Sequence, residues 1–101
     1  MREDPGVAQE SPVRVLVVDD QLPFRSAARS VVDRLPGFQV IGEAESGEAA
    51  VAMAAQHSPD LVLMDINMGS MDGIEATRHI VAADPAVMVV LLSTYGLGDL
   101  P

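Results

Sequence analysis

Three aspartates stand directly after apolar segments, in positions where their carboxylates could act together. Asp19 and Asp20 follow the valine-rich segment 13–18, and Asp65 follows the segment 61–64. Both segments are largely apolar runs of the kind that forms parallel strands buried on two faces. The carboxyl ends of such strands meet at one edge of an open α/β sheet, where ligands bind. We therefore expect the three carboxylates to converge at that edge.

Three neighbouring carboxylates repel one another, which raises the pKa of each unless a cation lies among them. A single aspartate often ends a strand or caps a helix, but three in matching positions favour a site. Ligands that are all oxygen suit a hard divalent ion, and Mg²⁺ fits best because it takes one or two carboxylates and keeps several waters. Asp65 then becomes a candidate nucleophile, since carboxylates accept phosphoryl groups covalently beside a metal that neutralises charge.

The segment 65–73, with the sequence DINMGSMDG, connects this chemistry to a family. It resembles the loop after the third strand of response-regulator receiver domains, the phosphoacceptor modules of two-component signalling. The resemblance includes VVDD at 17–20 and VVLLS at 89–93, and it covers almost everything after the first dozen residues. Each motif is weak alone, whereas three in this order and at this spacing are specific.

The resemblance implies a role for each matching residue. Asp65 matches the phosphorylated aspartate, and Asp19 and Asp20 match the acidic pair of the Mg²⁺ site, in which Asp20 would bind the ion directly. Asp65 and the main-chain carbonyl of Asn67 would complete the protein ligands. Ser93 matches the switch hydroxyl that binds the phosphoryl oxygen after transfer.

Other residues near these motifs carry weaker expectations. Thr94 matches a position that borders access to the phosphoryl group, so its role would be secondary, and either hydroxyl could instead cap a turn. The family usually has proline where this chain has Gly69, and glycine frees the backbone there without removing a ligand. The family's fifth strand begins with a phosphate-binding lysine, but residues 93–101 contain neither lysine nor arginine. They are also too few to build a crossover and another strand.

These motifs and the resemblance also predict the domain organisation. We expect a flexible tail over residues 1–12 and a receiver domain over residues 13–101 that lacks its last strand and helices. The alternation of strands and helices predicts an α/β fold, by resemblance a flavodoxin-like (CheY-like) doubly wound parallel sheet with the incomplete strand order 2-1-3-4. The helices are expected at 22–35, at 48–56 after the capping residue Ser46, and at 74–83, and the other strands at 38–42 and 87–92.

Composition restricts the partners. A formal charge of −9 with only six arginines and lysines disfavours direct contact with nucleic acid. The sequence has no signal peptide and no run of about 18 apolar residues that would span a membrane, so a cytoplasmic location is expected. The fourth strand would be a long apolar edge that invites pairing with another chain, and self-association is therefore expected.

The sequence is compatible with three classes of function to different degrees. The resemblance favours a receiver, not an enzyme, that promotes its own phosphorylation and dephosphorylation after a sensor histidine kinase phosphorylates Asp65, as part of a transcriptional response regulator in a phosphorelay. A phosphorylation-independent interaction module is the alternative, which the missing lysine favours and the intact acids disfavour. A flavin protein would need a hydroxyl-rich phosphate loop after the first strand, and a phosphatase would need an acid at position 67; neither is present.

Overall fold

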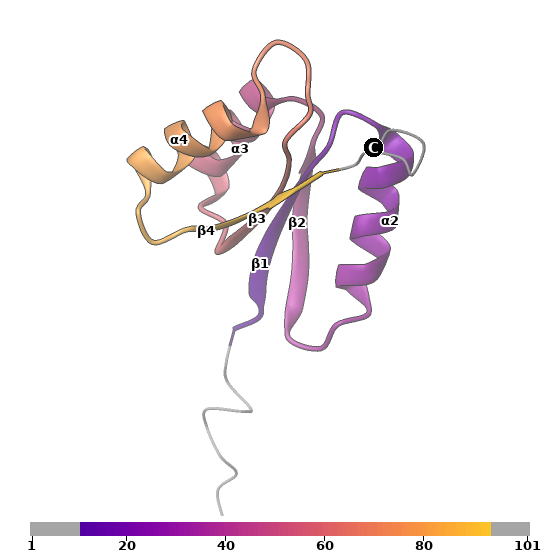
Figure 1. Cartoon of the computed structure of the whole chain (residues 1–101). Coiled ribbons are helices and arrows are strands. Elements are labelled where there is room, and N and C mark those ends of the chain that lie inside the picture. The colour runs from indigo at the N-terminus through magenta and orange to yellow at the C-terminus, as the bar shows by residue number, and fades with distance from the viewer. Residues whose placement is uncertain (1–10, 94–101) are drawn as a thin grey trace, which may run out of the picture.

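The computed structural model describes residues 11–93 as four strands and three helices that alternate along the chain (Figure 1). The strands are all parallel and lie in the order β2-β1-β3-β4. This confirms the predicted fold class and strand order. The elements are β1 (Val13–Val18), α2 (Leu22–Asp33), β2 (Phe38–Ala44), α3 (Gly47–His57), β3 (Leu61–Asp65), α4 (Gly73–Ala83) and β4 (Met88–Leu92).

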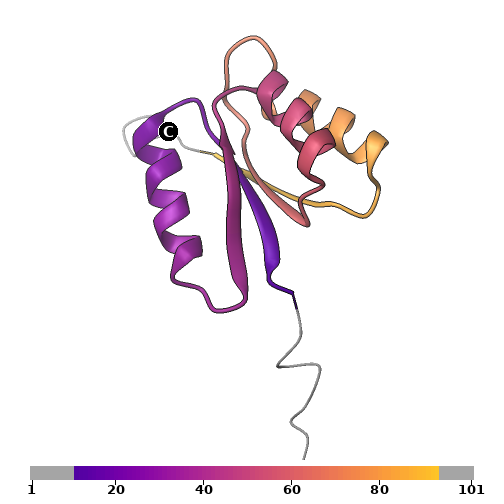
Figure 2. The same cartoon turned by 180° about the vertical axis from the view of Figure 1, so that it is seen from behind.

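The helices cover the two faces of the sheet unequally. Figures 1 and 2 show α2 on one side of the sheet and the pair α3 and α4 on the other. Among the described elements, α2 contacts only β1 and β2, whereas α3 and α4 together contact all four strands. On the α2 side of the sheet, none of the described helices covers β3 or β4.

Two apolar cores result from this arrangement. The larger lies between the sheet and the pair α3 and α4, and the smaller lies beneath α2. Alternate residues of β1 serve both cores because successive side chains of a strand point to opposite faces. The larger core contains Leu16, Val18, Ala44, Ala50, Val62, Met64, Met68, Ala76, Ile80 and Val87, and the smaller contains Val15, Val17, Val32 and Val40.

Local sequence accounts for where the helices begin and end. Ser46 caps α3 as predicted, because its hydroxyl accepts a hydrogen bond from the Ala49 amide at 3.0 Å. α4 is capped in the same way by Asp72, which accepts from the Glu75 amide at 2.8 Å. α2 ends at Asp33, two residues before the expected end at 35. Gly37, with a φ of +84°, then supplies a left-handed turn that few other residues adopt.

Some expectations concern residues that the structure does not describe. Residues 1–10 of the predicted tail lie outside the described part, and so does Thr94. Within residues 11–93, none of the helices has both the length and the apolar character needed to cross a membrane.

Candidate functional site

The three predicted aspartates meet at the carboxyl edge of the sheet. β1 and β3 are neighbours with Val18 opposite Met64, so the residues that follow, Asp19 and Asp65, lie side by side. The carboxylates of Asp19, Asp20 and Asp65 each offer an oxygen within 4.8 Å of the others. Asp19 and Asp65 are buried, with 6% and 1% of their surface exposed, whereas Asp20 is exposed. The predicted convergence is confirmed.

Main-chain and side-chain hydrogen bonds hold Asp19 on three sides. Its amide donates to the Ala44 carbonyl of β2 at 3.1 Å, and its own carbonyl accepts from Arg25 Nη1 at 2.8 Å. Its carboxylate Oδ1 accepts the Gln21 amide at 2.9 Å, which closes a tight turn between β1 and α2. The position of Asp19 is therefore fixed by β2, by α2 and by the turn that follows it.

The electrostatics of the cluster are unfavourable without a cation. Burial raises the pKa of the Asp19 carboxyl above its ordinary value, and the negative charges of Asp65 and Asp20 raise this pKa further. The Gln21 amide and the Arg25 guanidinium oppose that rise. A divalent cation at the cluster would offset the repulsion directly.

Asp65 stands at the start of a loop that is tied down at both ends. Its Oδ1 accepts the Asn67 amide at 3.1 Å, and the next residue, Ile66, donates its amide to the Leu92 carbonyl of β4 at 2.9 Å. The Gly73 amide donates back to the Ile66 carbonyl at 3.1 Å. A Cβ on Gly73 would overlap the main-chain oxygen of Asp65, so α4 begins in direct contact with this aspartate.

The N-terminal end of α3 supports the middle of the same loop. Ser70 Oγ donates to Glu48 Oε2 at 2.6 Å, and a Cβ on Gly47 would lie 2.6 Å from the carbonyl oxygen of Met71. Met68 anchors the loop in the larger core. The sequence did not predict these supports, since the spacing of Glu48 and Ser70 along the chain gives no sign that their side chains meet.

The remaining predicted residues are placed as follows. Asn67 is exposed and lies two residues beyond Asp65 in this loop. Ser93 is exposed and follows the last residue of β4, Leu92, which pairs in register with Asp65. Ser93 is therefore at the same edge of the sheet as the carboxylates, whereas Thr94 cannot be placed because it lies outside the described part.

The donor set fits a hard divalent ion. Every candidate ligand is an oxygen: three carboxylates close enough to share one ion, and the expected main-chain carbonyl of Asn67, two residues beyond Asp65. Two of the carboxylates are largely withdrawn from water, whereas the exposed Asp20 leaves one side of the cluster open to solvent. This is the ligand chemistry that Mg²⁺ prefers, with room for water in its remaining positions.

Comparison with known proteins agrees with this geometry. Residues 15–99 match the model of the response regulator receiver domain. The chain belongs to this family. Receiver domains are signalling modules of two-component systems, and they interact with histidine kinases and other phosphotransfer partners.

Individual relatives of this receiver carry different additional parts. It is 36% identical over 86 residues to the transcriptional regulatory protein DegU of Brevibacillus brevis, covering 85% of this chain and 36% of the relative. It is 44% identical over 84 residues to a protein-glutamate methylesterase/protein-glutamine glutaminase of Alkalilimnicola ehrlichii, covering 82% of this chain and 22% of that protein. The receiver thus spans between about a fifth and a third of these relatives.

A solved structure confirms the fold. A chain of the CheX–CheY–BeF3–Mg²⁺ complex from Borrelia burgdorferi superimposes with a TM-score of 0.76 at 33% identity. The match covers 89% of this chain and 68% of that one.

Proposed function

We propose that this receiver accepts a phosphoryl group on Asp65 from the phosphohistidine of a sensor kinase, with Mg²⁺ bound by Asp19, Asp20, Asp65 and the carbonyl of Asn67. The observation that carries the proposal is the convergence of three carboxylates at the sheet edge. The related Borrelia complex, which contains Mg²⁺ and BeF3, supports it. The module would act within a phosphorelay in the cytoplasm, as part of a transcriptional response regulator such as its relative DegU.

The transfer itself requires little of the protein beyond position and charge. A carboxylate oxygen of Asp65 attacks phosphorus, an O–P bond forms, and the P–N bond to the kinase histidine breaks. The departing imidazole keeps the electron pair of that bond and takes a proton from solvent. Bound Mg²⁺ would neutralise charge on the transferring group.

The protein's own groups prepare Asp65 for this role. The Asn67 amide holds Oδ1, which fixes the direction of the carboxylate. Gly73 allows α4 to begin against the Asp65 main chain, which supports the end of the strand beside the carboxylate. Ser93, at the same edge, would donate its hydroxyl to a phosphoryl oxygen after transfer, and Thr94 would have a secondary part. That new hydrogen bond would report phosphorylation to the segment after β4.

Phosphorylation by a small donor tests the proposal. The purified protein is incubated with acetyl phosphate and Mg²⁺, and intact mass is measured beside Asp65→Asn, which keeps the shape but loses the nucleophile. We expect a phosphoryl adduct on the wild type that requires Mg²⁺ and is absent from the variant. A folded protein that binds Mg²⁺ but gains no adduct would overturn the proposal in favour of a phosphorylation-independent interaction module.

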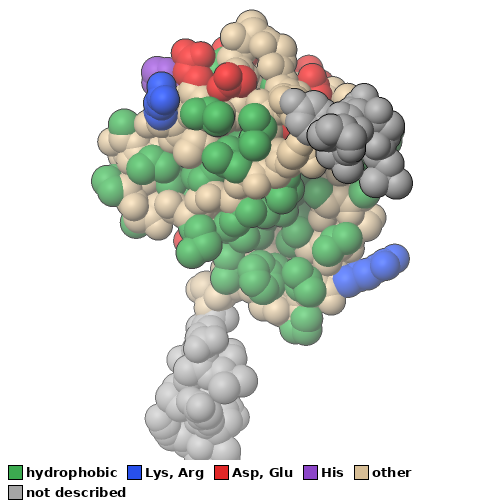
Figure 3. Space-filling view, viewed as in Figure 1, with side chains coloured by type: hydrophobic (Ala, Val, Ile, Leu, Met, Phe, Trp, Pro, Cys, Tyr) green, Lys and Arg blue, Asp and Glu red, His purple; other side chains and the backbone are tan. Residues whose placement is uncertain are grey.

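The edge of the sheet at β4 supports a second, weaker partner proposal, which is self-association. Met88 is 65% exposed, and Leu91 and Leu92 are about 40% exposed, on a strand that carries no charged side chain. Figure 3 shows hydrophobic side chains gathered on the face of the molecule that this strand crosses. The Met88 amide and the Leu92 carbonyl form hydrogen bonds on the β3 side of β4. Because alternate residues of a strand bond to the same neighbour, the main-chain polar groups of Val89 and Leu91 face away from β3. A second copy could pair there.

A further inference from the structure

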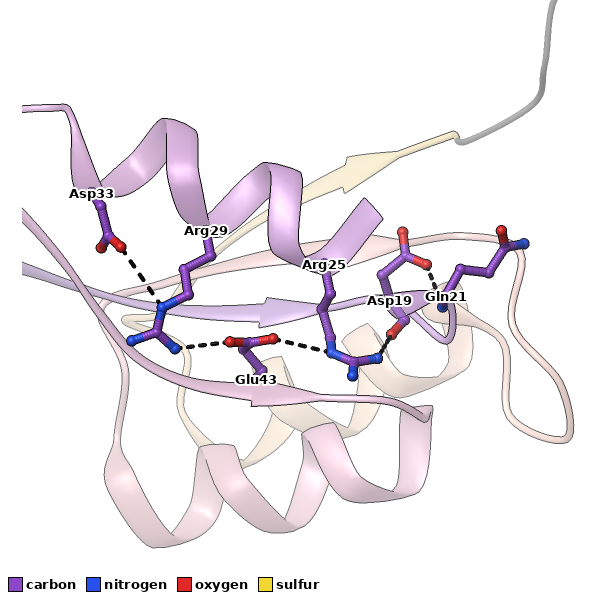
Figure 4. A network of polar contacts seen from close by, with 6 residues as sticks. All are labelled: Asp19, Gln21, Arg25, Arg29, Asp33 and Glu43. Carbon is purple, nitrogen blue, oxygen red and sulfur yellow. Dashed lines mark hydrogen bonds and ion pairs between the residues drawn. The ribbon is translucent and has the colours of Figure 1, made fainter. Parts of the chain in front are cut away.

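Arg25 joins three elements of the fold at the metal-binding end of the sheet. From the first turn of α2 its Nη1 donates to the main-chain carbonyl of Asp19 at 2.8 Å, and its Nε donates to Glu43 Oε1 on β2 at 3.2 Å (Figure 4). The side chain is only 13% exposed. One guanidinium therefore ties α2 to β2 and to the end of β1.

The bond to Asp19 acts on the exposed metal ligand beside it. Because a peptide unit is planar, a fixed carbonyl oxygen also fixes the plane that joins Asp19 to Asp20. The preceding peptide is held as well, since the Asp19 amide donates to the Ala44 carbonyl at 3.1 Å. The following turn is closed by the Gln21 amide on Asp19 Oδ1. The bond from Arg25 thus constrains the peptide from which Asp20 extends.

Glu43 is in turn held in place to receive Arg25. Its second oxygen accepts from Arg29 Nη1 at 2.8 Å, and Arg29 Nε lies 3.7 Å from Asp33 Oδ2. Hydrogen bonds from Arg29 and Arg25 hold the pKa of the Glu43 carboxyl below its ordinary value, so Glu43 is ionised at neutral pH. Only arginine can make both contacts of residue 25, because its planar fork presents several donors in fixed directions and lysine is a single point of charge.

We propose that Arg25 is a positioning residue of the acidic site: through its bond to the Asp19 carbonyl, it holds the Asp19–Asp20 peptide in the orientation that binds the metal. The effect on Mg²⁺ affinity rests on the proposed function, whereas the effect on the peptide does not.

Arg29 offers a matched control. It is an arginine on the same helix and it binds the same glutamate, but the hydrogen bond to the Asp19 carbonyl comes from Arg25 and not from Arg29. Arg29→Ala therefore removes the same charge without removing that bond. Arg25→Ala removes the bond, and Arg25→Lys keeps the charge but loses the fork. The lysine variant preserves the positive charge and the aliphatic part of the side chain. It therefore still tests the loss of the bond to Asp19 if the alanine variant fails to fold.

Two measurements separate the proposal from the proposed function. The first is the hydrogen-exchange rate of the Gln21 amide in the metal-free protein, followed by NMR, and the second is Mg²⁺ affinity by calorimetry. Arg25→Ala is expected to raise both the exchange rate and the dissociation constant about tenfold, which corresponds to one hydrogen bond from a charged donor. Arg29→Ala should change the exchange rate and the dissociation constant less than twofold. The values for Arg25→Lys should lie between those of Arg25→Ala and Arg29→Ala.

Each outcome decides a separate point. Equal effects of Arg25→Ala and Arg29→Ala on Gln21 exchange would overturn the positioning role, and so would an Arg25→Lys variant indistinguishable from wild type. If the wild type bound no Mg²⁺, the proposed function would fail, but the exchange rates in the metal-free protein would still decide whether Arg25 holds the peptide.

Discussion

Replacing Gly73 by alanine is expected to destabilise the protein and disturb the loop that follows Asp65. The new Cβ would overlap the main-chain oxygen of Asp65 and would lie 2.9 Å from both the Asp65 carbonyl carbon and Met64 Cγ. The first two atoms belong to the main chain of a central strand, and Met64 is fully buried. None of the three can move aside without shifting β3 or the larger core.

The magnitude follows from two opposing effects. Overpacking a buried contact costs about 1–3 kcal/mol. Exchanging glycine for alanine within a helix gains up to about 1 kcal/mol, and less at the first helical residue, where Gly73 stands. A net loss of about 1–2 kcal/mol remains, which lowers the midpoint of thermal unfolding by roughly 5–15 °C in a domain of this size.

Gly69→Ala is the matched control within the same loop. No atom lies within 4 Å of a Cβ built there, and the backbone of Gly69 is not in the left-handed region. This substitution should leave stability unchanged or raise it by about 0.4–1 kcal/mol, because alanine restricts the unfolded chain. Both variants are compared by thermal and urea unfolding followed by circular dichroism. A Gly73→Ala protein as stable as Gly69→Ala would refute the close packing of α4 on Asp65.

Four further outcomes are expected. Ser46→Ala should lower the free energy of unfolding by about 1 kcal/mol in urea titrations, because it removes the cap on the Ala49 amide; an unchanged midpoint would contradict the cap. The pKa of Glu43 is lowered in the folded protein, so the stability that ionised Glu43 contributes should be present above pH 4.5, the ordinary value, and should vanish as the pH falls through the lowered pKa. Unfolding of the wild type and of Glu43→Gln at pH 7 and pH 3 measures this contribution. Parallel pH profiles of the two proteins would count against it. Mg²⁺ at 100 times its dissociation constant should add about 2.7 kcal/mol to wild-type stability in thermal unfolding and much less to Asp20→Asn; equal gains would place the ion elsewhere. Val90→Lys should shift the sedimentation of a concentrated sample toward monomer, whereas a monomeric wild type would rule out pairing at β4.

The carboxylate cluster was predictable because it depends on strand ends alone. Parallel pairing of β1 with β3 places Val18 opposite Met64, and this register brings Asp19 and Asp65 together whatever the loops do. The capping residue Ser46 was predictable for a similar reason, since a cap acts on the three residues that follow it.

The supports of the cluster were not predictable from spacing. Arg25 and Glu43 are 18 residues apart, and they meet only because α2 crosses over β2. The helix was expected to begin at residue 74, but α4 begins at Gly73, whose lack of a side chain is required by the contact with Asp65. β2 was expected to end at residue 42 but continues to Ala44, because Ala44 pairs with Val18 and prolongs the ladder to the site. Each feature depends on tertiary contact.

Locating the phosphoryl group tests the central claim most directly. Borohydride reduces an aspartyl phosphate to homoserine and releases phosphate, so treatment of the phosphorylated protein marks the acceptor permanently. Peptide mass spectrometry is predicted to find homoserine at position 65 and at neither position 19 nor position 20. Homoserine at either of those aspartates, or none at all in a protein that is folded and binds Mg²⁺, would contradict the assignment of Asp65 as the acceptor.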